Sequence, residues 1–431
     1  MMVLPTFFLD ASRSERLGII GVMLIAFFGW VGVAGGYIGL TLVLLATLMN
    51  LQSLKFSRLW CLTSFRCLSL LILYVLAWEV AIRFILPEGT VESATRKWLL
   101  LLLPWLVLWF FRFPQLVPWA LVLAALGLLS ETVTIAIERW DTFTRVWEGG
   151  HVFVAKAWGL YLSTVVLGLI VFSPRIFSIK LPNRFATWGV WLLYSLIVVW
   201  MFQCLFAAQT RTAWASFFVV LAVVLVLFMV TMIKAIGKRQ GSSKVQIAIA
   251  LFMTIILTSI ITVNFDSIKS RLSLDHHSIE KILSGDENLT YGSATYRYLL
   301  SKYGVERWRD SPLFGLGPQS AEKIIKESTN SKLHQFSHFH NGYVEVLVQL
   351  GILGLALLLA ALLYMLYELF RAYFAGLVAG DYVLFISGVF IMIALWSILN
   401  YRMLRPDWLF YWLVLLGVCQ SFGLRRFSSK T

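Results

Sequence analysis

Residues 213–230 read AWASFFVVLAVVLVLFMV, a run without charge, glycine or proline. A helix that crosses a bilayer needs about 20 mostly apolar residues, and its backbone hydrogen bonds must close within the segment. Similar runs recur along the chain, which is 59% hydrophobic and 13% charged. A soluble globular protein has about 45–50% apolar and 25% charged residues. The sequence therefore predicts an all-α integral membrane protein.

The apolar runs predict twelve spans. They cover residues 17–34, 36–53, 67–86, 97–111, 115–137, 154–173, 186–207, 213–233, 245–264, 341–367, 381–400 and 407–424. Residues 1–264 thus hold the first nine spans, and residues 265–340 form a long loop. Residues 341–431 hold the last three spans and a short tail.

The distribution of Lys and Arg predicts the orientation of the spans. With the N-terminus inside, the short inside loops hold clearly more Lys and Arg than the short outside loops, as cytoplasmic loops do. Both termini are then expected in the cytoplasm, with the long loop on the opposite face. The first span is expected to be an uncleaved insertion signal. This bias explains the net charge of +14, and no nucleic acid partner is expected.

The long loop at 265–340 concentrates the residues that can do chemistry. A loop of this length in a compact protein is usually functional. Five of the six histidines lie in it, namely His276, His277, His334, His338 and His340. Apolar residues at three-to-four spacing predict helices over 295–309 and 320–326. The loop is therefore expected to be partly helical.

A polar stripe follows the histidine pair at the start of the tenth span, where residues 338–342 read HFHNG. Asn341 is a plausible helix cap, and Asn341, Glu345 and Gln349 share one helix face. Polar groups this deep in a span are expensive unless they face a cavity. A histidine at the rim of such a cavity can act as a general base, because histidine titrates near neutral pH. The alternative is a pair of interfacial histidines that only anchor the helix.

Two arginines are candidates to bind an anion. Arg211 lies in the short connection before the eighth span, and Arg297 lies in the long loop. Arg402 and Arg405 lie on the last short outside loop and are expected to reach the same cavity as the histidines. A guanidinium binds phosphate through two parallel hydrogen bonds. The alternatives are a snorkelling arginine for Arg211 and a solvated charge for Arg297. No HExxH, Walker or CxxC motif is present, so neither a metal nor a cofactor is expected.

Together these features resemble the O-antigen ligases and their relatives, the O-antigen polymerases and bacterial O-linked oligosaccharyltransferases. The shared pattern is His-Asn/Ser/Gln, nine residues, then GxxG, which here is His340-Asn341 followed by GILG at 351–354. Upstream, an Arg precedes a PLxGxG-type turn, here Arg297 and PLFGLG at 312–317. An Arg-Thr-Ala-Trp start to a span matches residues 211–214. The resemblance covers roughly residues 209–366.

The resemblance implies a GT-C-like glycosyltransferase architecture in the bacterial inner membrane. It implies an inverting, metal-independent transfer at the periplasmic face, from a glycan on undecaprenyl diphosphate to a sugar hydroxyl of lipid A–core. His340, with His338 as the close alternative, would take the proton of that hydroxyl. Arg211 and Arg297 would hold the diphosphate. Asn341, Glu345, Gln349, Arg402 and Arg405 are expected to line the cavity.

One dominant outside loop, twelve spans and a short C-terminal tail favour a ligase over a polymerase or an oligosaccharyltransferase. The alternative from another class is a membrane transporter or flippase, since many carriers have twelve spans. No internal two-fold repeat is visible in the sequence. A transporter would depend on intramembrane charges such as Glu131, whereas the ligase hypothesis predicts dependence on residues of the long loop.

Overall fold

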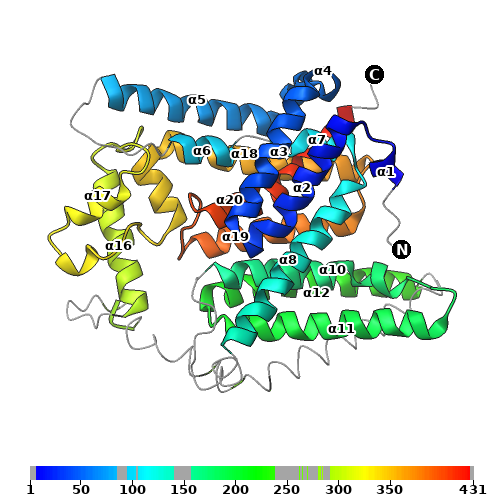
Figure 1. Cartoon of the computed structure of the whole chain (residues 1–431). Helices are drawn as coiled ribbons and strands as arrows, with labels where there is room; N and C mark the ends of the chain where they lie inside the picture. The colour runs from blue at the N-terminus through cyan, green and yellow to red at the C-terminus, as the bar shows by residue number, and fades with distance from the viewer. Residues whose placement is uncertain are drawn as a thin grey trace. The chain divides into compact units, whose positions relative to one another are not determined.

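A computed structural model describes residues 6–84, 95–102, 105–139, 157–237 and 292–427, with a few single positions between 262 and 284. Every regular element in these ranges is a helix (Figure 1). The helices are α1 (Thr6–Leu9), α2 (Arg13–Val31), α3 (Val33–Met49), α4 (Leu51–Leu54), η1 (Phe56–Cys61), α5 (Thr63–Phe84), α6 (Thr95–Leu102), α7 (Val107–Arg112), α8 (Leu116–Glu138), α10 (Trp158–Phe177), α11 (Arg184–Ala207), α12 (Arg211–Gly237), α16 (Ser293–Trp308), α17 (Ala321–Lys326), η3 (Ser331–Leu333), α18 (Gly342–Phe374), α19 (Gly380–Ser397), α20 (Pro406–Leu424) and η4 (Arg425–Phe427).

Within the described residues, nine helices are long and apolar enough to cross a membrane. Each coincides with a predicted span, which confirms an all-α multi-pass membrane protein. A tenth span is possible where α3 meets the segment Leu51–Cys61 at a bend of 89°; residues 36–53 were predicted there. The prediction for 245–264 falls outside the described residues, apart from position 262.

Residues 97–111 differ from the single span predicted for them. The structure places two short helices there, α6 and α7. Pro104 lies between them in the sequence, and proline has no amide hydrogen to continue a helix ladder. The two predicted helices of the long loop, in contrast, are present as α16 and α17.

The chain forms two compact units, and the first comprises residues 1–130, 293–379 and 397–431. Helix α20 is its central element, because every residue from Trp408 to Leu424 is buried, and it packs on α2, α7 and α18. Helices α2 and α3 approach closely where Gly21 faces Gly39, since a Cβ on either would lie 2.7 Å from the other's carbonyl oxygen. Small residues allow such contacts between membrane helices.

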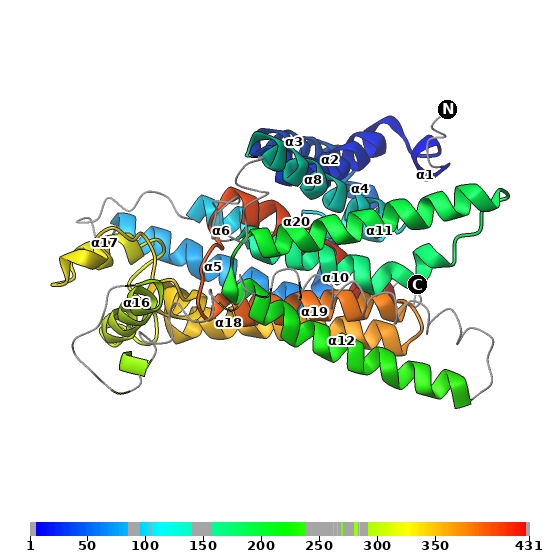
Figure 2. The ribbon, with the colours of Figure 1, turned by 90° about the horizontal axis from the view of Figure 1, so that it is seen from below.

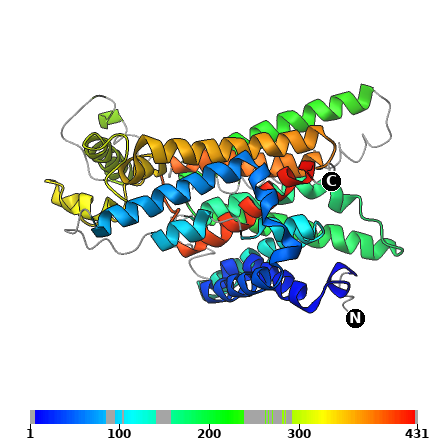
Figure 3. The ribbon, with the colours of Figure 1, turned by 90° about the horizontal axis from the view of Figure 1, so that it is seen from above.

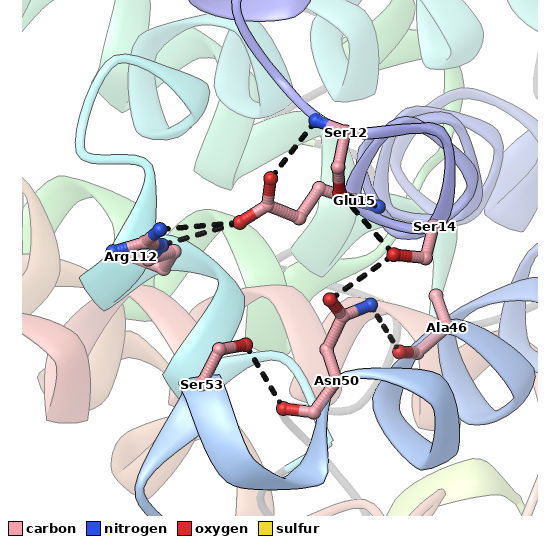
Figure 4. Close-up of polar contacts among 7 residues, drawn as sticks. All are labelled: Ser12, Ser14, Glu15, Ala46, Asn50, Ser53 and Arg112. Atoms are coloured by element: carbon pink, nitrogen blue, oxygen red, sulfur yellow. Dashed lines mark hydrogen bonds and ion pairs between the residues drawn. The ribbon is translucent and has the colours of Figure 1, made fainter.

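Polar contacts connect one end of the α2–α3 pair to α7 (Figure 4). Ser12 and Glu15 form a capping box at the start of α2, which satisfies two amide groups that would otherwise lack partners. Glu15 also accepts from Arg112 of α7, with Nη2 at 3.3 Å. The Ser14 hydroxyl donates to Asn50 at the end of α3, at 3.1 Å. These bonds join the ends of α2, α3 and α7.

Helices α5 and α18 run side by side in the first unit (Figure 3). A buried polar group joins them to α20: Glu368 accepts from the Ser64 amide at 3.1 Å and from its hydroxyl at 2.5 Å, and Gln420 donates to the same hydroxyl at 3.0 Å. Buried polar groups that are satisfied in this way specify one arrangement of helices. The α5–α18 pair therefore has a defined register.

The second unit comprises residues 131–292 and 380–396. Helix α10 packs against both α11 and α12, and the three helices are labelled in Figure 2. Arg175 of α10 pairs with Asp381 of α19, with Nη2 2.7 Å from Oδ1. Gly388 of α19 lies against Leu167 and Val220. This unit holds Arg211 and Glu131.

Candidate active site

The polar stripe predicted for the tenth span lies at the start of α18. The Asn341 side chain accepts hydrogen bonds from the amides of Tyr343 and Val344, at 3.0 and 3.1 Å, so its predicted role as a helix cap is confirmed. Glu345 and Gln349 follow on the same face and are only 2% and 1% exposed. The cap fixes where α18 begins, and with this start the face that carries Glu345 and Gln349 is turned into the protein.

The stripe is satisfied by hydrogen bonds to the backbone around it. Gln349 donates to one Glu345 oxygen at 2.8 Å, and the Phe339 amide donates to the other at 2.8 Å. The Gln349 side-chain oxygen accepts from the Gln319 amide at 2.9 Å. Buried polar groups need such partners. Glu345 therefore holds the segment with both histidines, and Gln349 holds the segment after the 312–317 turn.

Phe339 anchors the histidine pair from between its two members. Its side chain is fully buried in an apolar cluster that includes Leu300 of α16, Ile325 of α17 and Val348 of α18. Helix α16 approaches closely at Gly304, where a Cβ would lie 2.9 Å from the Phe339 ring. Burial of a Phe side chain contributes about 1.5–3 kcal/mol. The long-loop helices thus fix the position of the histidines just before α18.

The two histidines lie against each other. Their ring centroids are 4.1 Å apart, and Nδ1 of His338 accepts a hydrogen bond from the backbone amide of His340 at 3.2 Å. His340 is 7% exposed and has a backbone φ of +56°, a left-handed conformation that is uncommon outside glycine. A neutral His338 then carries its proton on Nε2, because Nδ1 is the acceptor.

Helix α18 is broken at Gly351, within the segment 341–367 that was predicted as one span. Gly351 has φ +66° and ψ −171°, which interrupts the helical ladder. The amides of Ile352 and Leu353 donate instead to the carbonyls of Pro312 and Leu313, at 2.9 and 3.2 Å. The carbonyls of residues 348 and 349 accept from the amides of residues 316 and 317, at 2.7 and 3.0 Å. The 312–317 turn therefore completes the hydrogen bonds of the broken helix.

Two glycines make this interlock possible. A Cβ on Gly351 would lie 2.3 Å from the Leu313 carbonyl oxygen. A Cβ on Gly315, which has φ +77°, would lie 2.6 Å from the Gly351 amide nitrogen. Glycine is needed at Gly351 for its backbone conformation. The two sequence motifs are thus parts of one structure.

Tyr74 and Trp78 of α5 complete this structure, and neither stood out in the sequence. The Tyr74 hydroxyl lies 2.7 Å from the Phe314 carbonyl and 3.0 Å from the Leu350 carbonyl, so its single hydrogen is shared. The Trp78 indole donates to the Phe314 carbonyl at 3.1 Å. The only sequence signal was an aromatic pair with hydrogen-bonding groups at i, i+4 in an apolar span. These side chains join α5 to the turn and the break.

Tyr74→Phe is expected to lower the free energy of unfolding by about 1–2 kcal/mol, because the Leu350 carbonyl loses its donor. The measurement is thermal unfolding of the purified protein in detergent. Tyr37→Phe on α3 is the matched control, since Tyr37 lies on the exposed side of its helix. Equal midpoints for the two variants would show that the hydroxyl contributes nothing.

A cavity of about 170 Å³ opens beside the histidine pair. Its lining includes Lys97, Gln319, Glu322, His338, Glu345, Gln349, Tyr401, Arg402 and Arg405. The structure thus brings together five of the residues singled out in the sequence: His338, Glu345, Gln349, Arg402 and Arg405. His340 lies next to this lining through its contact with His338, and Asn341 caps the helix at the edge. Lys97, Gln319 and Tyr401 were not expected.

Tyr401 and Arg402 form one wall of the cavity. Burial raises the pKa of Tyr401 well above its ordinary value, and the nearby Glu345 carboxylate acts in the same direction. A tyrosine is protonated near neutral pH even at its ordinary pKa of about 10, so the Tyr401 hydroxyl can donate a hydrogen bond. Its ring centroid lies 5.8 Å from that of His338. Arg402 is paired with Asp407, with Nε at 2.9 Å from the carboxylate.

The arginines of the long-loop and span motifs lie outside this lining. Arg297 is half-buried on α16, which packs on α18. Arg211 is the first residue of α12 in the second unit. The connection before it is closed by a bond from the Trp214 indole to the Leu205 carbonyl at 2.8 Å. Assignment of these two arginines to a substrate rests on their motifs.

The part of the chain that the structure describes contains no group of three His, Cys, Asp or Glu side chains arranged to hold a metal ion. Metal-independent transfer stays a prediction.

Comparison with known proteins bears on the segment that carries these motifs. A search of the curated proteins finds no match to the chain. Residues 196–359 match a family model described as O-Antigen ligase. The matched segment includes Arg211, Arg297, the 312–317 turn, both histidines and the break at Gly351. This segment of the chain therefore carries the sequence pattern of the O-antigen ligase superfamily.

Proposed function

We propose that the protein is an O-antigen ligase. It transfers a glycan from undecaprenyl diphosphate to a sugar hydroxyl of lipid A–core, at the periplasmic face of the bacterial inner membrane. The observation that carries the proposal is the cavity in which His338 and the buried Glu345–Gln349 pair meet cationic side chains. Such a cavity suits a polyhydroxylated acceptor, because it offers hydrogen-bond donors and acceptors beside a base.

In this reaction the acceptor hydroxyl gives its proton to a histidine and attacks the anomeric carbon of the donor. The new bond forms as the bond from the anomeric carbon to the diphosphate oxygen breaks, with inversion, and the electron pair leaves with the diphosphate. Arg211 and Arg297 hold the diphosphate and stabilise its charge as it leaves. The proton transfer and the stabilisation of the leaving diphosphate both use only side chains of this protein.

We assign the proton transfer to His340. A general base needs an unprotonated ring nitrogen within reach of the hydroxyl. In a neutral His338, Nδ1 is occupied by the His340 amide, and Nε2 carries the proton. This arrangement supports His338 as a hydrogen-bond donor to the acceptor sugar and leaves the motif histidine as the base.

A transfer assay tests the proposal. The purified protein is incubated with a glycan on undecaprenyl diphosphate and with rough lipopolysaccharide, in the presence of a chelator. Lipopolysaccharide that gains glycan supports the ligase. A longer lipid-linked glycan with unchanged lipopolysaccharide would identify a polymerase, and glycan on an added acceptor protein an oligosaccharyltransferase. No product in any arm would contradict enzymatic transfer and favour transport, for which Glu131→Gln is the first variant to examine.

Arg297→Lys is expected to lower the rate of glycan transfer about tenfold, because an ammonium group cannot make the two parallel bonds of a guanidinium and a loss of 1.36 kcal/mol equals a factor of ten. The measurement is the initial rate at saturating acceptor. Arg309→Lys is the control, since Arg309 is an exposed cation just beyond α16. A rate that changes equally in both variants would contradict a diphosphate role for Arg297.

A further inference from the structure

The charges around the cavity are arranged by depth. Glu345 is almost completely buried and both of its oxygens accept hydrogen bonds. Lys97 on α6 and Arg405 at the start of α20 are exposed, although both line the same cavity. The carboxylate therefore lies deep and two cations lie toward solvent, and the two ends of a bound molecule would meet different chemistry.

Two other charged residues of the lining are already neutralised. Arg402 is paired with Asp407 at 2.9 Å, and Glu322 is paired with Lys326 at 2.7 Å. Within the described part of the chain, neither Lys97 nor Arg405 has a carboxylate at ion-pair distance. Clustered cations that lack an anion favour binding of an anionic ligand.

A hydrogen-bond acceptor in the same cavity also lacks a donor. The side-chain oxygen of Gln319 is buried, and no donor reaches it from the described residues. Its backbone is held in place, because its amide donates to the side-chain oxygen of Gln349 at 2.9 Å. A buried acceptor without a donor costs about 1–3 kcal/mol. A hydroxyl group of a bound molecule would satisfy it.

We propose that this cavity binds the acceptor as an anionic sugar, one that carries a phosphate or carboxylate substituent. The substituent lies on Lys97 and Arg405, and a hydroxyl of the same sugar donates to Gln319. The inference rests on the proposed function, which requires a sugar acceptor beside the histidines, and it adds the charge class of that acceptor. The proposed function assigns the donor diphosphate to Arg211 and Arg297. Lys97 and Arg405 are therefore assigned to the acceptor.

Direct binding tests the site without any transfer reaction. Glucose 6-phosphate and glucose are compared as probes by saturation-transfer NMR on the purified full-length protein. Wild type is expected to bind glucose 6-phosphate at least tenfold more tightly. The double variant Lys97→Gln/Arg405→Gln should lose this preference. The control Lys302→Gln/Arg309→Gln removes two exposed charges outside the lining and should keep it. Gln319→Met should weaken both sugars alike.

Kinetics then assign the site to the acceptor. With a phosphorylated acceptor, the Lys97→Gln/Arg405→Gln variant should raise the acceptor KM about tenfold or more, with kcat little changed, since each lost contact of 1.4 kcal/mol is a factor of ten. With the same acceptor after phosphatase treatment, the acceptor KM of variant and wild type should agree. The KM for the donor should not change.

Three results would overturn the proposal: equal binding of the two probes by wild type, equal losses in the control variant, or a raised KM for the donor instead of the acceptor. The failure of the proposed function is a separate outcome. Phosphate-dependent probe binding that the double variant loses supports the anionic-sugar site even if no glycan transfer to lipopolysaccharide is found.

Discussion

His340→Ala is expected to lower the rate of glycan transfer about 10²–10⁴-fold, the usual contribution of a positioned general base. The acceptor hydroxyl would then have to lose its proton to water. The measurement is the initial rate of transfer to lipopolysaccharide, with thermal unfolding of the same preparation to verify the fold. His340 is almost fully buried and packs against Phe336 and His338, so the loss of packing must be measured separately from the loss of the base.

Two other histidines provide the controls for this variant. His338→Ala should have a smaller effect on turnover and raise the KM for the acceptor, because the assigned role of His338 is to donate a hydrogen bond. His334→Ala should leave the rate unchanged, since His334 is exposed and bonds to the Ser328 carbonyl. A larger loss of turnover in His338→Ala than in His340→Ala would reverse the assignment of the base.

Gly351→Ala is expected to remove transfer activity and to lower the free energy of unfolding by about 3 kcal/mol. The pair φ +66°, ψ −171° lies in a region that is open essentially to glycine alone, at a cost of about 1–3 kcal/mol for other residues. The added Cβ would also lie 2.3 Å from the Leu313 carbonyl oxygen, where the turn must approach. The turn would then separate from α18, and the Gln319–Gln349 bond would be lost with it.

The measurements are the thermal unfolding midpoint in detergent and the transfer rate. Gly189→Ala is the matched control, because Gly189 lies inside α11 and a Cβ there would have no neighbour within 4 Å. A Gly351→Ala protein with the stability and activity of wild type would show that the interlock of the turn with α18 is dispensable.

The break in α18 could not be predicted from the local sequence. Glycine permits both close helix packing and a positive φ, so GILG at 351–354 is compatible with a continuous span. The outcome depends on the 312–317 turn, which supplies carbonyl acceptors for Ile352 and Leu353. Only the tertiary structure shows that this partner is present at hydrogen-bonding distance.

The sequence by itself determined the properties that arise from local chemistry. Long apolar runs must form helices in a membrane, and nine of the predicted spans are helices in the structure. The cap at Asn341 followed from its residue type, since an Asn side chain accepts from the first amides of a helix. The inward stripe of Glu345 and Gln349 followed from helix periodicity, because side chains at i and i+4 share a face. The motif spacing was sufficient to indicate the superfamily.

The tertiary structure alone decided which distant segments meet. Lys97 joins the cavity from α6, Gln319 from the segment beyond the turn, and Arg405 from the start of α20. Tyr74 and Trp78 reach the broken helix from α5. These contacts depend on how the helices pack, and hydropathy is the same for any arrangement of the same spans. The sequence therefore supplied the helices and the chemistry of the motifs, and packing decided which side chains share one site.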